Sequence, residues 1–164
     1  MSQDVKEMSD EAILDRVVRL GFDNNVQRFE TFKAMLREGL PQGTGVALRG
    51  SVVTNQKFKD GRPFDADGPG TSDLDVTLIG SEAMNCWDND EYYIPTLHTK
   101  PLGDETPQIA PALNPLRQRL QQLVGRPVNF QATANIILFA RDVLLDEPYF
   151  VIIDAAEREA EEVS

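Results

Sequence analysis

Hydrophobic residues recur every three or four positions along the first forty residues of the chain. Ile13, Val17 and Leu20 form one apolar stripe, and a second stripe follows over 26–40. This spacing is typical of amphipathic helices that bury one face. Gly21 interrupts the pattern, so we expect two helices, or one kinked helix, that end in the Gly/Pro-rich turn "GLPQGTG".

Shorter apolar runs, rich in β-branched residues, follow this helical region. The segments "VALRGS" (46–51), "LDVTLIG" (74–80) and "RPVNFQAT" (126–133) predict three strands. The run "ANIILFA" (134–140) fits a short helix or a buried strand equally well. The segment "DVLLDEPYFVII" (142–153) predicts two short strands around an Asp-Glu-Pro turn.

Three further segments complete the pattern. The segment "NPLRQRLQQLVG" (114–125) predicts a helix that Asn114 can cap and Gly125 can end. The turn-rich stretch 52–71 indicates a hairpin. The proline-dense stretch 81–112 is longer than ordinary loops, which makes it a candidate functional insertion. Its tryptophan and tyrosines favour a packed segment.

Composition adds the class of protein. The chain has 164 residues, of which 41% are hydrophobic and 26% charged, as in an ordinary globular domain. We therefore expect a single domain spanning 1–164, of the α+β (mixed α/β) class, with frayed acidic ends at 1–8 and 157–164. The net charge of −11 argues against extended nucleic-acid binding, because phosphate recognition needs a basic surface.

Cysteine content and hydropathy narrow the setting. The single cysteine, Cys86, excludes an internal disulfide and a cysteine-based zinc site. The chain contains no apolar run of about 18 residues and opens with no basic-then-apolar leader. We therefore expect a soluble, cytoplasmic protein without membrane contacts.

Candidate chemistry begins with two aspartates, Asp73 and Asp75, at the start of the second predicted strand. Side chains two apart on a strand point to the same face, so the two carboxylates should lie side by side. Such a pair suits a hard cation such as Mg²⁺, which shares oxygen ligands with substrate phosphates. Gly50 leaves room for a phosphate, and Ser51 adds hydrogen-bond donors. A solvated loop edge or a structural Ca²⁺ site is the alternative.

In this arrangement, "LRGS" followed by "SDLDV" resembles the signature of the nucleotidyltransferase fold, the superfamily of DNA polymerase β. The chain looks most similar to the small bacterial nucleotidyltransferase domains over 29–143. The resemblance implies a twisted mixed sheet with helices packed on one face. It also implies that Asp73 and Asp75 bind Mg²⁺, or Mn²⁺, and that Gly50 and Ser51 hold the phosphates of a nucleoside triphosphate.

Two departures from this family stand out. The loop between the Gly-Ser and the aspartates is longer than usual. The family normally adds a third carboxylate in a Gly-Arg-Pro-Val-Asp context, whereas this chain has "GRPVNF", with Asn129 at that position. Asparagine can offer a carbonyl oxygen but brings no charge and is no base. Two carboxylates could suffice, Asp142 or Asp154 could replace the third, the domain could bind without turnover, or Asn129 is an ordinary strand residue.

The resemblance implies transfer of a nucleoside monophosphate from a nucleoside triphosphate to an acceptor hydroxyl on a protein, an RNA end or a small molecule. A catalytically degenerate nucleotide-binding regulatory or interaction module is one alternative. A toxin-like member of a toxin–antitoxin pair, which needs a protein partner, is another. Lys57, Lys59 and Arg62 could contact the triphosphate or the acceptor, or could belong to a solvated hairpin. His98, the only histidine, is expected to be structural.

Overall fold

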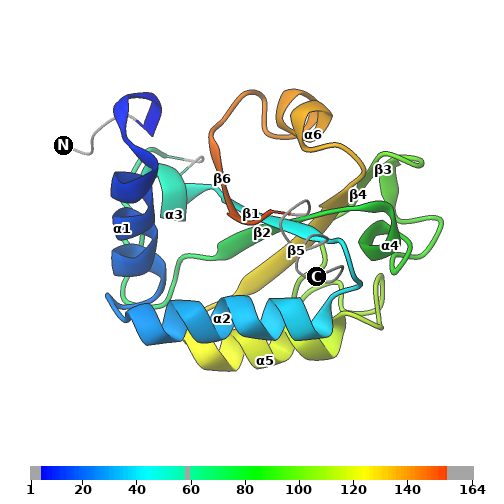
Figure 1. The fold of residues 1–164 in the computed structure, drawn as a ribbon, viewed down its shortest axis with the longest axis horizontal. Coiled ribbons are helices and arrows are strands. Elements are labelled where there is room, and N and C mark those ends of the chain that lie inside the picture. The colour runs from blue at the N-terminus through cyan, green and yellow to red at the C-terminus, as the bar shows by residue number, and fades with distance from the viewer. Residues whose placement is uncertain (1–4, 58–59, 155–164) are drawn as a thin grey trace, which may run out of the picture.

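The computed structural model of the protein describes residues 5–57 and 60–154. Its strands there are β1 (Gly45–Arg49), β2 (Leu74–Ile79), β3 (Tyr92–Ile94), β4 (His98–Thr99), β5 (Val128–Thr133) and β6 (Tyr149–Ile153). Within the described residues these form one six-stranded sheet, in the order β3-β4-β5-β2-β1-β6. Figure 1 shows this sheet crossing the middle of the molecule. The α+β class expected from the sequence is confirmed.

The register of the central strands brings three polar residues to one level of the sheet. Strand β1 pairs antiparallel with β2 and with β6, whereas β2 pairs parallel with β5. Arg49 lies opposite Asp75, which in turn lies opposite Asn129. Because strand side chains alternate between faces, these three residues share one face of the sheet. The central strands therefore present a polar face and an apolar face.

The helices are η1 (Val5–Glu7), α1 (Asp10–Gly21), α2 (Val26–Gly39), α3 (Ser51–Thr54), α4 (Ser81–Met84), α5 (Asn114–Val124) and α6 (Ile136–Asp142). In Figure 1, α2 and α5 run side by side along one face of the sheet, and α6 lies on the other side. The expectation of helices on one face thus holds for α2 and α5, whereas α6 covers part of the polar face.

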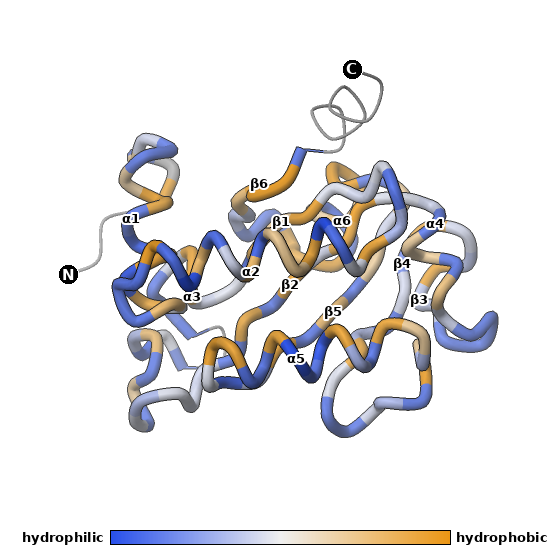
Figure 2. Tube along the Cα trace, turned by 60° about the horizontal axis from the view of Figure 1, so that its bottom comes forward, coloured by the Kyte–Doolittle hydropathy of each residue, from blue (hydrophilic) through white to orange (hydrophobic). Residues whose placement is uncertain are grey.

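The apolar face and the long helices enclose the core. Leu36 of α2, Leu74 and Leu78 of β2, and Phe130 of β5 are fully buried. Figure 2 shows how hydrophobic and hydrophilic positions alternate along α2 and α5, as the helical periodicity predicts. None of the helices in the described part of the chain is long and apolar enough to cross a membrane.

The structure tests several of the expected local elements. Two separate helices, α1 and α2, replace the single kinked alternative, and the Asn25 side chain caps α2 by accepting from the Arg28 N–H at 3.0 Å. The ambiguous run 134–140 contributes to helix α6. The segment 142–153 contains one strand, β6, and not two. Between β1 and β2 the described residues form α3 and turns, so the expected hairpin is absent there.

The stretch 81–112 is packed, as its aromatic residues suggested. It contributes α4 and the strands β3 and β4, which extend the sheet beyond β5. Trp87 is buried and donates its indole N–H to the Lys100 carbonyl at 2.8 Å. At the N-terminus, Val5 packs into the core, so a frayed end covering all of 1–8 is wrong for residues 5–8. Residues 1–4 and 157–164 lie outside the described residues.

Candidate functional site

A cleft of about 850 Å³ opens where β1 ends and β2 begins. Four of the five predicted site residues, Gly50, Ser51, Asp73 and Asp75, line this cleft. The fifth, Asn129, contacts two of them from the neighbouring strand β5. The structure therefore brings together all the residues that the sequence pattern selected.

Gly50 occupies a backbone conformation that other residues avoid. Its φ is +79° and its ψ is −154°, at the junction where β1 ends and the short helix α3 begins. A Cβ atom at this position would lie 2.9 Å from the Asp75 carboxylate oxygen Oδ2. Glycine is therefore needed both for the turn and for the close approach of this backbone to the acidic pair.

One amide group holds the two aspartates together. The Asn129 Nδ2 donates to Asp73 Oδ2 at 3.0 Å and to Asp75 Oδ1 at 3.2 Å. Both carboxylates thus converge on the same point in space, as their alternate positions on the chain predict. The register pair of Asp75 with Asn129, formed by the parallel strands β2 and β5, places the amide there.

The electrostatics of this pair favour a cation. Partial burial raises the pKa of Asp73, and although the hydrogen bond from Asn129 lowers it, the neighbouring charges of Asp75 and Asp104 raise it further. Lys57 lowers it slightly, but the net direction is upward. A raised carboxyl pKa means that the surroundings disfavour the ionised form, and a bound cation would reverse this penalty.

The donor set fits an open divalent-cation site shared with a substrate. Asp73 and Asp75 offer carboxylate oxygens, and the Asn129 amide, if turned over, would add its carbonyl oxygen. That carbonyl oxygen now lies against Gly103, where a Cβ atom would come within 2.7 Å of it. Among residues 5–57 and 60–154, no group of three or more His, Cys, Asp or Glu side chains is placed to hold a metal ion.

Basic residues line the same cleft, but acids neutralise them. Lys57 pairs with Asp67 at 2.8 Å, and Arg62 pairs with Asp60 at 2.8 Å and with Asp67 at 3.0 Å. Hydrogen bonds from the Arg62 backbone and side chain lower the pKa of Asp60, and the hydrogen bond from Lys57 lowers that of Asp67. The third predicted basic residue, Lys59, lies outside the described residues.

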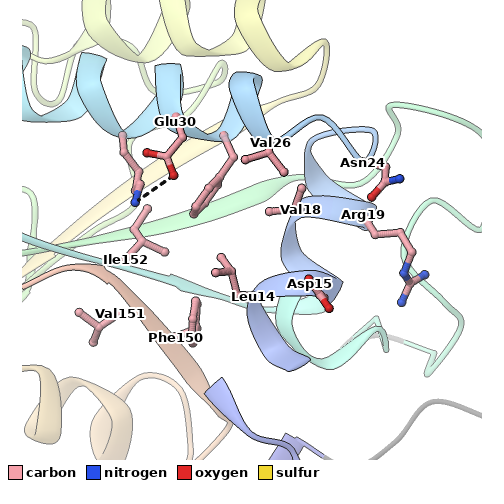
Figure 3. Close-up of a pocket in the computed structure, with 12 residues that line it drawn as sticks. Leu14, Asp15, Val18, Arg19, Asn24, Val26, Glu30, Phe150, Val151 and Ile152 are labelled. Carbon is pink, nitrogen blue, oxygen red and sulfur yellow. Dashed lines mark ion pairs between the residues drawn. The ribbon is translucent and has the colours of Figure 1, made fainter. Parts of the chain in front are cut away.

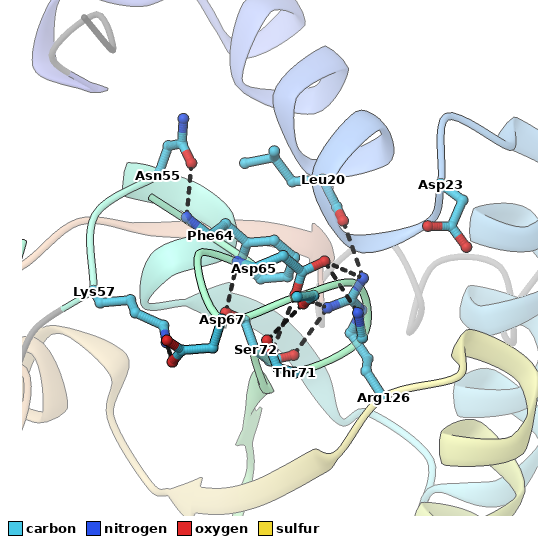
Figure 4. A network of polar contacts seen from close by, with 12 residues as sticks. Leu20, Asp23, Asn55, Lys57, Phe64, Asp65, Asp67, Thr71, Ser72 and Arg126 are labelled. Atoms are coloured by element: carbon cyan, nitrogen blue, oxygen red, sulfur yellow. Dashed lines mark hydrogen bonds and ion pairs between the residues drawn. The ribbon is translucent and has the colours of Figure 1, made fainter. Parts of the chain in front are cut away.

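The sequence analysis missed a buried arginine that fixes the approach to Asp73. Arg126, two residues before the start of β5, donates to both carboxylate oxygens of Asp65 at 2.8 and 3.0 Å and to the Ser72 carbonyl at 3.0 Å. Its guanidinium lies 4.6 Å from the centre of the Phe64 ring (Figure 4). Burial raises the pKa of Asp65, but hydrogen bonds from Arg126 and Ser72 outweigh this, and the pKa is lowered.

This network fixes the position of the chain around Ser72. Asp65 also accepts from the Ser72 N–H at 2.9 Å, and Ser72 immediately precedes Asp73. The end of the long connecting loop is thus tied to a buried ion pair one residue before Asp73. The arginine of "GRPVNF" therefore has a structural role that its place in a motif did not reveal.

A second arginine missed by the sequence analysis, Arg49, forms part of the cleft wall. Its Nε donates to the Thr77 hydroxyl at 3.2 Å, and its Nη2 donates to Gln131 Oε1 at 2.7 Å. The ring of Phe139, on α6, lies 5.6 Å from the guanidinium carbon. Arg49 thus connects β1, β2, β5 and α6 on the polar face of the sheet.

The two acids considered as substitutes for a third carboxylate do not reach the cleft. Asp142 accepts from His98 Nε2 at 3.0 Å and from Arg141 Nε at 2.7 Å, and neither it nor Asp154 is among the described residues that line the cleft. His98 is fully buried and also contacts the Thr133 hydroxyl at 2.9 Å, which confirms a structural role. The cleft does contain another acid, Glu147, on the segment between α6 and β6.

A second cavity, of about 550 Å³, lies between α1, α2 and β6 (Figure 3). Its lining is mainly apolar and includes Leu14, Val26 and Phe150, with the ion pair between Lys33 and Glu30 at 3.5 Å on its wall. None of the predicted site residues lines it. The chemistry-bearing residues are therefore concentrated in the cleft beside β1 and β2.

In comparisons with protein-family models, curated proteins and solved structures, the chain matched none of them. The function of the protein is therefore inferred from the geometry of its own residues.

Proposed function

We propose that the protein is a Mg²⁺-dependent nucleotidyltransferase of the nucleotidyltransferase fold. It moves a nucleoside monophosphate from a nucleoside triphosphate to an acceptor hydroxyl and releases pyrophosphate. The observation that carries this proposal is the convergence of Asp73 and Asp75 on one point beside Gly50, in a cleft that also contains basic residues. Mn²⁺ has the same oxygen-ligand preference and would serve as well.

The residues at the β1 end of the cleft are suited to the triphosphate. Gly50 has no side chain to block a phosphate, and Ser51 provides a hydroxyl next to it. Lys57 and Arg62 supply positive charge on the same wall once the triphosphate displaces Asp60 and Asp67. Phosphate oxygens and carboxylates compete for the same donors, so this exchange replaces one set of charge-assisted hydrogen bonds by another.

The acidic pair contributes charge and position. A divalent cation bound to Asp73 and Asp75 would neutralise the carboxylates and the phosphates together. The amide of Asn129 keeps both carboxylates aligned, but it cannot remove a proton from the acceptor hydroxyl. Catalysis would therefore depend mainly on positioning and on charge neutralisation.

The wall facing these residues comes from the segment 143–147, between α6 and β6. Val143, Leu144 and Leu145 line the cleft there, whereas no residue of the stretch 81–112 does so among the described residues. We therefore assign contacts with the acceptor or with the nucleobase to residues 143–147. The acceptor class stays open among proteins, RNA ends and small molecules, and the net charge of −11 disfavours long nucleic acids.

The test uses each of the four nucleoside triphosphates labelled at the α-phosphate, with Mg²⁺ or Mn²⁺ and a cell lysate. Label should pass to an acceptor with the wild type and not with Asp73→Asn/Asp75→Asn. A matched control, Asp88→Asn/Asp90→Asn, removes two exposed carboxylates with the same spacing outside the cleft and should transfer label normally. Transfer by the double cleft variant at the wild-type rate would contradict the proposal.

A second candidate function, a module that binds nucleotide without transferring it, is favoured by one observation. Asn129 presents an amide donor to both aspartates, where the resemblance leads us to expect a third carboxylate. This candidate predicts saturable binding of a nucleoside triphosphate, weakened by Asp73→Asn/Asp75→Asn, and no label transfer under any condition.

A further inference from the structure

We infer that Arg49 binds an anionic group of the substrate, a phosphate or a carboxylate, at a subsite separate from the one that holds the outer phosphates. This inference rests on the proposed function, because it takes the cleft beside β1 and β2 as the substrate site. The cleft gives Arg49 its access to substrate.

Arg49 is half-buried, so its charge is partly removed from water without being neutralised by an ion pair among the described residues. Its hydrogen-bond partners, Thr77 and Gln131, are neutral, and its third neighbour is the Phe139 ring. Among the described residues no carboxylate lies within ion-pairing distance of it. Burial lowers the pKa of Arg49, while the more distant charge of Asp75 and the Tyr93 hydroxyl raise it. Binding of an anion beside the Arg49 guanidinium would therefore be favourable in these surroundings.

Other arginines of this chain show how burial is normally compensated. Arg117, almost fully buried, donates to Asp104 at 2.9 Å, and Arg126 makes a two-point contact with Asp65. A buried charge without such a partner is unfavourable, so proteins rarely retain one unless a ligand supplies the opposite charge. Arg49 differs from both because it faces the cleft.

Its hydrogen bonds with the described residues use only part of the guanidinium. The Nε and Nη2 nitrogens donate to Thr77 and Gln131, and no hydrogen bond is formed by Nη1 with the described residues. An arginine has five N–H donors in a planar fork, which matches the two oxygens of a phosphate or a carboxylate. Thr77, Gln131 and Phe139 hold this fork in place, so an anion would meet a preorganised donor.

The position along β2 separates this subsite from the triphosphate end. The polar face of β2 presents Asp75 and then Thr77, and the Arg49 guanidinium contacts Thr77. Lys57 lies toward the other end of the acidic pair, since its charge acts on Asp73, and Ser51 begins α3 after the chain has passed Arg49, the β1 residue opposite Asp75. Arg49 therefore meets a different anionic group, either the α-phosphate of the nucleotide or an acidic group of the acceptor.

The experiment observes Arg49 directly, in the full chain, through its ¹H–¹⁵N side-chain signal. The Nε–H signal of Arg49 is identified by its loss in Arg49→Lys. Titration with inorganic phosphate, acetate and ATP, each in the absence of acceptor, should shift this signal in a saturable way with at least one anion. A shift with ATP and Mg²⁺ at far lower concentration than with phosphate assigns the subsite to the nucleotide. A shift with phosphate or acetate that persists in the presence of ATP assigns it to the acceptor.

Variants test the same point by affinity. Arg49→Gln should weaken binding of the effective anion about tenfold or more, as expected for loss of a charge-assisted contact, and Arg49→Lys should retain part of it. The control Arg119→Gln removes the same charge from an exposed position of α5 and should leave the affinity unchanged. Thermal unfolding of each variant shows whether the fold is retained, and the titration of the wild type does not depend on any variant except for assignment.

An Arg49 signal that no anion moves would overturn the inference, and so would equal anion affinity in folded Arg49→Gln and wild type. These outcomes are independent of label transfer. If no nucleotide is transferred but the Arg49 signal shifts, the proposed reaction fails and the anion subsite stands. If label is transferred and the signal does not respond, the subsite fails and the proposed reaction stands.

Discussion

Gly50 shows how a single residue positions the acidic pair. With φ at +79° and ψ at −154°, position 50 lies in a backbone region that is nearly restricted to glycine, and a Cβ there would approach Asp75 Oδ2 to 2.9 Å. We therefore predict that Gly50→Ala lowers the free energy of unfolding by more than the roughly 1–3 kcal/mol that this sparsely populated backbone region costs alone, because Asp75 must also move. Denaturant unfolding measures this loss.

The control for this prediction is Gly125→Ala. Gly125 has φ at +69°, and a Cβ there would meet nothing within 4 Å, so only the backbone strain remains. Gly125→Ala should therefore lower the free energy of unfolding by less than Gly50→Ala does, without any change in metal or nucleotide binding. Equal losses for the two variants would show that the contact with Asp75 has no energetic weight.

A second prediction concerns Asn129. In Asn129→Asp the amide that donates to Asp73 and Asp75 is replaced by a third carboxylate, so like charges meet at one point. Without divalent cations the variant should be less stable than the wild type. With Mg²⁺ it should gain more stability than the wild type does, because three carboxylates bind a hard cation more tightly than two. Thermal unfolding across a Mg²⁺ titration tests both signs, and identical responses of the two proteins would place Asn129 outside the cation site.

The raised pKa of Asp73 leads to a third prediction, on pH. Its causes are burial first and then the charges of Asp75 and Asp104, opposed by the hydrogen bond from Asn129. A carboxyl whose folded pKa exceeds its unfolded value favours folding when protonated, and it costs stability once pH rises through the folded pKa. In the absence of divalent cations, Asp73→Asn should therefore be more stable than the wild type at pH 7. The difference should shrink as pH falls through the raised pKa of the folded state and vanish below the ordinary aspartate pKa, and a constant difference from pH 7 to pH 3 would contradict this assignment.

Helix α6 is connected to the cleft through Arg49. Its Phe139 is fully buried, lies 5.6 Å from the Arg49 guanidinium and meets the His98 ring edge-on at 5.4 Å. We predict that Phe139→Ala destabilises the protein by about 3–5 kcal/mol, the usual cost of emptying a buried aromatic site. The matched control is Ile137→Ala on the same helix, where the side chain is 71% exposed and the loss should stay below about 1 kcal/mol.

Local sequence rules predicted most of the features that depend on residues close together in the chain. Alternation along β2 placed Asp73 and Asp75 together, and the helical periodicity of α1, α2 and α5 was correct, including the end of α5 at Gly125. The run 134–140 stayed ambiguous because a short apolar segment satisfies both periods. The cap that decides it, Asn135, accepts from the Ile137 and Leu138 N–H groups. Helix α5 does not use the expected Asn114 cap, because that side chain accepts from Arg117 instead.

Contacts between residues far apart in the sequence could not be predicted from these local rules. Arg126 and Asp65 are far apart in the sequence and meet because β2 pairs in parallel with β5. The role of Arg49 depends on Gln131 across two strands and on a helix whose type was undecided. Nothing in the short motifs reports on such neighbours, so the acidic pair could be found from the sequence while its supporting arginines could not.

For the molecule as a whole, the question is how a chain with a net charge of −11 attracts a polyanionic nucleotide. In the described cleft, Lys57 and Arg62 are held by Asp60 and Asp67, so the local potential is weaker than the basic residues alone would create. Removing those two acids frees the cations locally while leaving the rest of the surface strongly negative. A variant that lacks both acids thus changes the charge of the cleft while leaving the charge of the remaining surface unaltered.

We predict that Asp60→Asn/Asp67→Asn strengthens ATP binding several-fold at low ionic strength, with the gain fading in high salt as screening increases. Binding of a single-stranded RNA of twenty nucleotides should stay weaker than about 10⁻⁴ M at physiological salt for both proteins, because the net charge stays strongly negative and repels a phosphate backbone. Calorimetry with ATP and fluorescence anisotropy with the RNA measure the two affinities. A parallel gain for both ligands would mean that net charge, and not the Lys57–Arg62 cluster, governs access to the cleft. An unchanged ATP affinity would mean that the triphosphate lies elsewhere in the cleft, beyond the reach of these two cations.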